Sequence, residues 1–461
     1  MERKNPLLVP ELRELLAAED HATLRDFCQE THPAAVAELI AALSHEEAWA
    51  VLRQAEPVLR AEIFSHLDEE TQVEMVASLS RREAARLLAD MAPDDRADLF
   101  KHLPEDRREA ILPAMAHAER EDIRRLAAYQ EGTAGAVMTS DYATLEPGMT
   151  ASQAIERLRD VAPDRETIYY AYVIDEHRRL LGFVSLKDLI VARRDALVAD
   201  IMHSEVVYAR VDDDQEDAAR TIRKYDLIAL PVLDSADALV GIITHDDAID
   251  IIIQEHTEDM EKFMAIAGAH EDAVYMRTGV WGHFKNRALW VVALAVLGLV
   301  SGFIVQSFEG LLLQFAVLAA FMPMLADTGG NTGSQSATLV VRALALREVG
   351  PRDILRILAK EVRVAMLLAL LLGTIAFARV LVFGGGSSIP DGVSLNTIGL
   401  AIAIALGLQV ITSTLIGALL PLGAARMKWD PAVVASPALT TVVDITGLLI
   451  YFTTAKLLLG L

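Results

Sequence analysis

Cysteine is almost absent from this chain. Cys28 is the one cysteine among 461 residues, so no disulfide can form within the chain, which suits a reducing cytosol. The first residues, MERKNPLLVPELRELL, lack the basic start, apolar run and small cleavage residues of a signal peptide. We therefore expect the polar first half of the chain to stay in the cytoplasm.

Positive charge is scarce in the same half. The chain has 42 Lys and Arg against 65 Asp and Glu, a formal net charge of −23. From residue 280 onward there are 12 basic and 8 acidic residues, which leaves 30 and 57 before that point. Such an acidic excess repels nucleic acid and anionic lipid and attracts cations. Solubility alone is the competing explanation of this excess.

The chain also lacks the common signatures of enzymes. It has no Gly-Lys-Ser/Thr loop to hold phosphate, no Cys/His metal cluster and no nucleophile motif, and its 12 histidines are scattered. We therefore expect a protein that is not an enzyme.

Long apolar stretches fill the second half of the chain. A helix needs about 20 residues to cross about 30 Å of hydrocarbon, and five stretches reach that length. They run at about 288–308, 311–345, 364–383, 397–425 and 432–458. Lys and Arg between these stretches fall on one side of the membrane, which predicts a cytoplasmic N-terminus and an external C-terminus.

Polar residues interrupt two of these stretches. Asp444 lies in the middle of the last one, where a carboxylate costs at least about 2.5 kcal/mol and usually faces water or an ion. The second stretch contains Pro323-MLADTGGNTGSQSAT, in which Asp327 and Asn331 offer oxygen ligands. Its glycines indicate close helix packing or local unwinding. Together these features point to a cation pathway.

Two repeats organise the first half. Turn-like positions recur every 12 residues over about 30–120, each followed by a short amphipathic segment, which predicts an α-helical solenoid. Over about 137–253, the segment from Val137 is repeated from Ile201, and Gly182-FVSLKDLI is repeated as Gly241-IITHDDAI. Each copy predicts the order strand, helix, strand, strand, helix.

This second duplication resembles the paired cystathionine-β-synthase-type (CBS) domain. The resemblance implies an adenine-nucleotide site, with Ser185 and Asp188 of one copy and Thr244 of the other placed to meet phosphate and ribose. Tyr170 could stack on the base, although a core tyrosine is an equal alternative. Residues 253–275 follow as an acidic amphipathic segment, which predicts a connecting helix suited to protein packing or cation binding.

The order of these parts, with Asp327-TGGNTGSQSATLVVRALA and Asp430-PAVVASPALTTVVDITGLLIYF, resembles the MgtE family of magnesium channels and transporters over essentially the full length. The resemblance implies a multidomain membrane protein. Its domains are a helical solenoid at 1–130, an α/β CBS-domain pair at 131–252, a connecting (plug) helix at 253–275 and a five-helix all-α transmembrane domain at 276–461.

The resemblance also implies a homodimer in the cell (inner) membrane. Its single pore would lie on the two-fold axis, with Asp444 as the pore aspartate and with Asn331 and Asp327 as further ligands for Mg²⁺. Cytosolic Mg²⁺ would close the pore by joining acidic surfaces, with ATP as a further regulator. The carried-over sensor residues are Asp94, Asp95, Asp214, Glu216, Asp226, Asp246, Asp247, Asp250, Glu255, Glu258, Asp259 and Asp430.

Two other functions stay open at this point. One is a secondary transporter that couples Mg²⁺, Co²⁺ or Mn²⁺ movement to H⁺ or Na⁺ through Asp444 or Asp327. The other is a membrane receptor in which the CBS pair senses a nucleotide. Mg²⁺ current that is insensitive to pH and Na⁺ gradients favours a channel over the coupled transporter, and absence of divalent flux in liposomes favours the receptor.

Overall fold

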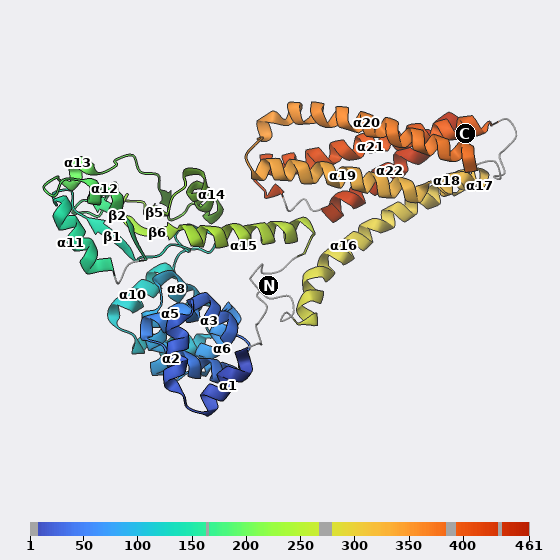
Figure 1. Ribbon diagram of the computed structural model, residues 1–461. Coiled ribbons are helices and arrows are strands. Elements are labelled where there is room, and N and C mark those ends of the chain that lie inside the picture. Colours follow the sequence, from blue (N-terminus) through green and yellow to red (C-terminus); the bar gives the residue numbers. More distant parts are fainter. Residues whose placement is uncertain (1–7, 163–165, 267–278, 384–392, 432–435, 461) are drawn as a thin grey trace. The chain divides into compact units, whose positions relative to one another are not determined.

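The computed structural model describes residues 8–162, 166–266, 279–383, 393–431 and 436–460. The chain forms two compact units, Met1–Glu255 and His256–Leu461, and each is described by itself (Figure 1). The first contains the helical domain and the CBS pair, and the second contains the long apolar helices.

The helical domain is a stack of short helices, as the 12-residue period predicts. Helix α3 packs on α5 and α5 on α7, while α4 packs on α6 and α6 on α8, so alternate helices form two layers. The helices are α1 (Val9–Ala17), α2 (His21–Glu30), α3 (Pro33–Ile40), α4 (His45–Leu52), α5 (Pro57–Ser65), α6 (Glu69–Ser78), α7 (Arg81–Asp90), α8 (Pro93–His102), α9 (Glu105–Ile111) and α10 (His117–Leu126).

The repeat is set by how these helices begin. Ser44 and Ser80 each cap a helix with their side chains and form capping boxes with the glutamate three residues later. Pro57 and Pro93 stand at the first positions of α5 and α8, where the fixed φ of proline suits a helix start. Between these starts, buried Leu, Ile and Phe side chains form one continuous core.

The CBS pair contains two three-stranded sheets of identical topology. In order, its elements are β1 (Tyr142–Leu145), α11 (Ala151–Val161), β2 (Thr167–Ile174), β3 (Leu180–Ser185), α12 (Leu186–Val191), α13 (Val198–Ile201), β4 (Ala209–Arg210), α14 (Gln215–Tyr225), β5 (Ala229–Leu233), β6 (Leu239–Thr244) and α15 (His245–Phe263). The first two strands of each sheet are parallel and the last two antiparallel. This arrangement confirms the duplication seen in the sequence.

The two copies share a small aromatic core. Tyr142 and Tyr172 from the first copy pack with Leu239 and Ile242 from the second. The Tyr142 hydroxyl donates a hydrogen bond to the Leu239 carbonyl at 2.8 Å. The halves of the duplication therefore fold as one body.

The connecting helix differs from the expected boundaries. Helix α15 begins at His245, directly after β6, and continues without a break to Phe263. The segment expected at 253–275 therefore starts inside the last CBS helix, and residues 267–278 lie outside the described residues.

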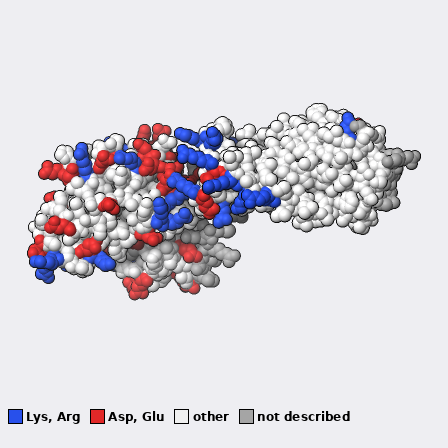
Figure 2. Space-filling model, turned by 90° about the horizontal axis from the view of Figure 1, so that it is seen from above, with Lys and Arg blue, Asp and Glu red and all other residues white. Residues whose placement is uncertain are grey.

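The second unit consists of helices with few charged side chains, which appear as a nearly white body in the space-filling view (Figure 2). They are α16 (Val280–Ser307), α17 (Glu309–Gln314), α18 (Ala316–Ala319), α19 (Met322–Ala345), α20 (Ile354–Phe383), α21 (Leu395–Arg426) and α22 (Ser436–Leu459). Helix α21 lies against α19, α20 and α22.

Four spans within the described residues are long and apolar enough to cross a membrane: Val280–Ser307, Pro351–Phe383, Leu395–Arg426 and Pro437–Leu459. The expected second span at 311–345 is not one helix. It is divided into α17, α18 and the 24-residue α19, and the polar residues of α19 lower its hydropathy. A fifth span therefore remains a prediction.

Candidate cation pathway and acidic sensors

Asp444 lies midway along α22 and is partly buried. Its Oδ1 atom is enclosed by the protein, and no hydrogen bond reaches it within the described part of the chain. One turn earlier, Thr440 meets Gly330 of α19, where an added Cβ would lie 3.1 Å from Thr440 Cγ2. The carboxylate therefore lies close to the packed interface between α19 and α22, with one oxygen enclosed and without a partner in the described residues.

A stripe of polar side chains runs along α19. Asp327, Asn331, Gln335 and Thr338 are all exposed in the single chain, and their spacing of three or four residues places them on one helix face. The Asn331 amide donates to Asp327 Oδ1 at 3.2 Å. In a membrane these groups require water or another protein surface beside them.

The glycines of α19 serve close packing. Helix α19 is continuous through Gly329, Gly330 and Gly333, so the local unwinding that the sequence left open does not occur. A Cβ on Gly333 would lie 3.2 Å from the Ser413 carbonyl oxygen of α21. The small-residue packing alternative therefore accounts for these glycines.

Another carboxylate in this unit was missed by the sequence reasoning. Glu361 of α20 is 9% exposed and accepts a hydrogen bond from Ser336 of α19 at 2.8 Å. Both side chains line a cavity of about 330 Å³ that Arg342 and Lys360 also line. The alternation of apolar and polar residues at the start of α20 gave no signal that this one carboxylate is buried.

In the first unit, predicted sensor residues come together between the helical domain and the CBS pair. Asp94 and Asp95 stand in the first turn of α8, and Asp246 and Asp247 in the first turn of α15. Glu166, which the sequence did not single out, joins them electrostatically. Asp94 Oδ1 is buried and has no partner in the described residues. Five negative side chains thus share one region.

Their protonation equilibria reflect this crowding. Burial, followed by the charges of Asp247 and Asp95, raises the pKa of Asp94 well above its ordinary value. Burial raises the pKa of Asp247 to about 6, against the opposing hydrogen bond from Thr244. Partial burial and then the charges of Asp247 and Asp246 raise the pKa of Glu166 to about 7. A bound cation would relieve each of these costs.

The carboxylates do not form a tight metal cage. Within the described residues, no three or more His, Cys, Asp or Glu side chains converge in a way that could hold a metal ion directly. Mg²⁺ gives up its water reluctantly and usually keeps several water ligands. The charge of the cluster therefore fits a hydrated Mg²⁺ held partly through water.

The predicted sensor residues around α14 also have roles in its structure. Asp214 caps α14 by accepting from the Glu216 backbone, and Glu216 pairs with Arg220. Asp226 ends the helix in a left-handed conformation, with φ 51°. Glu255 accepts a hydrogen bond from Gln215 at 2.7 Å, whereas Asp250 is exposed on α15.

The remaining predicted sensors meet in the second unit. Lys262 Nζ lies 2.6 Å from Glu258 Oε1 and 3.2 Å from Asp430 Oδ2. Burial, together with the negative charge of Asp430, raises the pKa of Asp259. Asp430 thus faces the connecting helix near Glu258 and Asp259, and the sequence analysis did not identify the ammonium group of Lys262 between Glu258 and Asp430.

Three of the four predicted nucleotide residues, Tyr170, Ser185 and Asp188, lie around β3, whereas Thr244 ends β6 in the second copy. The Ser185 hydroxyl donates to Asp188 Oδ2 at 2.6 Å and begins α12, while Thr244 and Asp247 make the equivalent pair in the second copy. Asp188 Oδ2 lies 3.1 Å from His203 Nε2. Tyr170 packs edge-on against Phe183, with ring centroids 5.2 Å apart.

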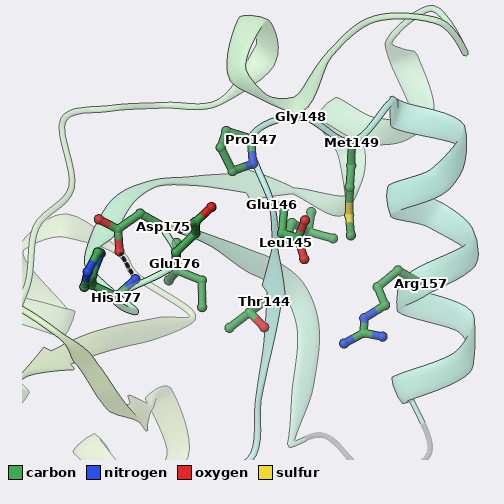
Figure 3. A pocket seen from close by; sticks show the side chains of 11 residues that line it. Thr144, Leu145, Glu146, Pro147, Gly148, Met149, Arg157, Asp175, Glu176 and His177 are labelled. Carbon is green, nitrogen blue, oxygen red and sulfur yellow. Dashed lines mark hydrogen bonds between the residues drawn. The ribbon is translucent and has the colours of Figure 1, made fainter.

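A cavity of about 760 Å³ lies elsewhere on the first CBS copy (Figure 3). It is lined by the loop after β1, by Arg157 of α11 and by the turn after β2, where the His177 backbone donates to Asp175 Oδ1 at 2.8 Å. None of Tyr170, Ser185, Asp188 and Thr244 lines it. The cavity and the predicted nucleotide residues are therefore separate places.

Comparison with known proteins settles the family. A family model described as a divalent cation transporter matches residues 322–454, the MgtE intracellular N domain matches 31–132, and CBS domains match 134–195 and 198–254. The magnesium transporter MgtE of Thermus thermophilus is 40% identical over 455 residues, 98% of each chain. The chain belongs to the MgtE family. This membership agrees with the expectation that it is a multi-pass membrane protein and not an enzyme.

Two further relatives of this MgtE-family protein agree. The magnesium transporter MgtE of Bacillus subtilis is 35% identical over 341 residues, 74% of this chain and 73% of that protein. The crystal structure of the soluble part of a magnesium transporter is 34% identical, covers 53% of this chain and 97% of that one, and gives a TM-score of 0.51.

Raised carboxyl pKa values predict the response of the first unit to pH. Asp247 and Glu166 bind protons more tightly in the folded chain than in the unfolded chain, whose carboxyls titrate near pH 4. Without Mg²⁺, the contact between α8 and the CBS pair should therefore become more stable as the pH falls from 8 through the folded pKa values of about 6 and 7. Hydrogen exchange of the α8 amides, corrected for intrinsic rates, measures this.

The matched control is Asp247→Asn, which should flatten this pH dependence. Protection of α8 that weakens on acidification, or that responds to pH equally in the variant, would contradict the electrostatic explanation.

Proposed function

We propose that this MgtE-family protein conducts Mg²⁺ across the inner membrane and is closed by Mg²⁺ that binds its cytosolic acidic surfaces. The observation that carries the proposal is the Asp444 carboxylate, whose enclosed oxygen has no hydrogen-bonding partner in the described residues. A charge of this kind within an apolar span is costly unless it serves an ion. The curated relatives in Thermus thermophilus and Bacillus subtilis are named magnesium transporters.

Two chains are needed to complete the pathway. The exposed face of α19 presents Asp327, Asn331, Gln335 and Thr338, which cannot face lipid without an energetic cost. A homodimer that brings two such faces together around an axis surrounds them with water and protein. Two Asp444 carboxylates then face one ion, and they hold hydrated Mg²⁺ without binding it too tightly to leave. Asn331 and Asp327 supply further oxygen atoms.

Regulation follows from charge repulsion at the acidic surfaces. Without a cation, Asp94 and Asp95 of α8 repel the carboxylates at the start of α15. Burial first, and then the neighbouring negative charges, raise the pKa of Asp94, Asp95 and Asp247. Mg²⁺ bound among them favours the compact arrangement, and a second group at Glu258, Asp259 and Asp430 ties α15 to the segment before α22. High cytosolic Mg²⁺ thus shifts the population towards a closed pore. The negative electrostatic potential that attracts Mg²⁺ is strengthened by the other predicted sensor residues: Asp214, Glu216, Asp226, Asp246, Asp250 and Glu255.

The proposed orientation in the membrane rests on the basic residues. Lys and Arg in alternate connections favour a cytoplasmic N-terminus, with both acidic groups in the cytoplasm and the C-terminus outside. The sensor therefore reads the Mg²⁺ concentration that the channel itself raises, which makes the protein a feedback device for Mg²⁺ homeostasis.

An adenine nucleotide such as ATP is the proposed second regulator. Asp188 is held by Ser185 and lies beside His203, and its side chain remains 33% exposed. A carboxylate at this position can accept hydrogen bonds from both ribose hydroxyls. Tyr170 and Thr244 complete the proposed site.

Neutralising the pore aspartate should stop transport. Asp444→Asn keeps the size of the side chain but removes the charge that attracts the divalent ion. We expect Mg²⁺ flux into liposomes to fall to background while the dimer fraction in cross-linking stays unchanged. Asp353→Asn, in the partly buried turn before α20, serves as the control and should retain flux. Normal flux through Asp444→Asn would remove this residue from the pathway, and flux that depends on a pH or Na⁺ gradient would favour coupled transport.

Removing two sensor charges should leave the channel open at high internal Mg²⁺. The double variant Glu258→Gln with Asp259→Asn weakens the site that Mg²⁺ must occupy, so we expect inhibition to require about tenfold more Mg²⁺. The matched control is Glu105→Gln with Asp106→Asn, which removes the same charge from the exposed start of α9. Patch-clamp recording with stepped cytosolic Mg²⁺ measures both, and equal half-inhibitory concentrations would exclude Glu258 and Asp259 as sensors.

Loss of the Asp188 carboxylate should weaken nucleotide binding. Asp188→Ala removes charge-assisted hydrogen bonds, so affinity for ATP should fall by at least about tenfold. Asp160→Ala, an exposed residue of α11, is the control. Calorimetric titration of the full chain with ATP measures both, and an unchanged affinity in Asp188→Ala would move the nucleotide to another place, such as the cavity beside Arg157.

A further inference from the structure

Gln409 is the most completely buried amide side chain of the helical bundle. It belongs to α21 and is 1% exposed. Its Nε2 donates a hydrogen bond to the carbonyl oxygen of Leu325 in α19 at 3.0 Å. Its Oε1 is also buried and has no partner in the described residues. An apolar side chain of the same size would avoid that unsatisfied oxygen, so burial alone does not explain why glutamine occupies this position.

Two glycines on neighbouring helices make room for this side chain. A Cβ on Gly447 of α22 would overlap Gln409 Nε2 and would lie 2.6 Å from its Cδ, and its three nearest atoms all belong to Gln409. A Cβ on Gly329 of α19 would also overlap Nε2 and would lie 3.1 Å from Cδ. The Gln409 side chain is therefore wedged between α19 and α22.

The contacts of the wedge lie beside the proposed pore residues. Leu325 is two residues before Asp327, Gly329 is two residues before Asn331, and Gly447 is three residues after Asp444. A shift of either glycine would also move these side chains, because each lies within one turn of the same helix. Buried atoms as tightly packed as these leave no room for compensating movement.

We infer that Gln409 is a positioning residue for cation passage. It fixes the spacing between the Asp327–Asn331 segment of α19 and Asp444 of α22, and so it sets how tightly and how selectively the pathway holds a hydrated divalent ion. This inference rests on the proposed transport function. We do not propose Gln409 as a ligand of the ion, because its amide is packed between Gly329 of α19 and Gly447 of α22.

A double-mutant cycle tests the wedge itself. Gly447→Ala in the otherwise unchanged chain introduces a Cβ that collides with Gln409, and we expect Mg²⁺ flux to fall. Adding Gln409→Ala removes the colliding atoms. Mg²⁺ flux through the double variant should therefore be at least about fivefold higher than through Gly447→Ala alone, a coupling typical of residues in contact.

Gly417→Ala is the matched control for this cycle. Its Cβ would collide with the backbone of Gly333 and not with Gln409, so Gln409→Ala should not rescue it. If Gln409→Ala rescues both glycine variants equally, or rescues neither, the wedge assignment is wrong.

A second measurement separates positioning from mere stability. Gln409→Met keeps the length of the side chain but removes the bond to Leu325, and we expect the Mg²⁺ concentration for half-maximal flux to shift by about two- to tenfold, the factor for one net hydrogen bond. The preference for Mg²⁺ over Ca²⁺ should change with it. Thr414→Val is the control, since Thr414 is equally buried in α21 but bonds within its own helix to Val410.

The outcomes are distinct. A lower unfolding temperature in Gln409→Met with unchanged half-maximal concentration and unchanged ion preference would show that Gln409 only supports packing, and it would overturn the inference. If the unmodified protein moves no Mg²⁺ in liposomes, the proposed function fails first, and the positioning role fails with it. If the unmodified protein transports Mg²⁺ normally and the Gln409 variants show the same half-maximal concentration and the same ion preference, only the positioning role is excluded.

Discussion

Negative charge without a nearby positive partner is the constraint on which this structure depends. It recurs in the enclosed oxygen of Asp444 in α22 and in the crowded carboxylates of Asp94, Asp247 and Glu166. In each place the folded chain keeps a carboxyl group that a cation could stabilise. In the proposed function, the same physical principle would serve both conduction in the membrane and sensing in the cytosol, with Mg²⁺ as the ion in each case.

Much of the architecture could be predicted because it repeats. Helix starts recur every 12 residues at the N-cap positions Ser44, Glu56, Asp68 and Ser80, and a repeated start signal is visible without knowing any contact. The CBS duplication is equally visible, since both copies must form the same strand order. Asp444 stood out because a single charge in a long apolar run is improbable by chance and costly in lipid.

Other features depend on contacts that no local pattern encodes. In the sequence, Gln409 is one polar residue in an apolar helix. Its packing role depends on glycines about 80 residues before it and nearly 40 after it, which the sequence does not show to be its neighbours. In the sequence, Lys262 is one charge among several on an amphipathic helix, and its ion pair with Asp430 appears only in the structure. The expected second span is divided at Phe315 and Phe321, which are both buried in the core, and composition alone does not reveal these breaks.

The buried state of Cys28 has a practical consequence. The side chain is 0% exposed in the core of the helical domain, and burial raises the pKa of its thiol to about 11. At neutral pH the reactive thiolate is then on the order of one molecule in ten thousand, and it is shielded from solvent as well. A single cysteine introduced on the surface can therefore carry a fluorescent or spin label with the native residue left in place.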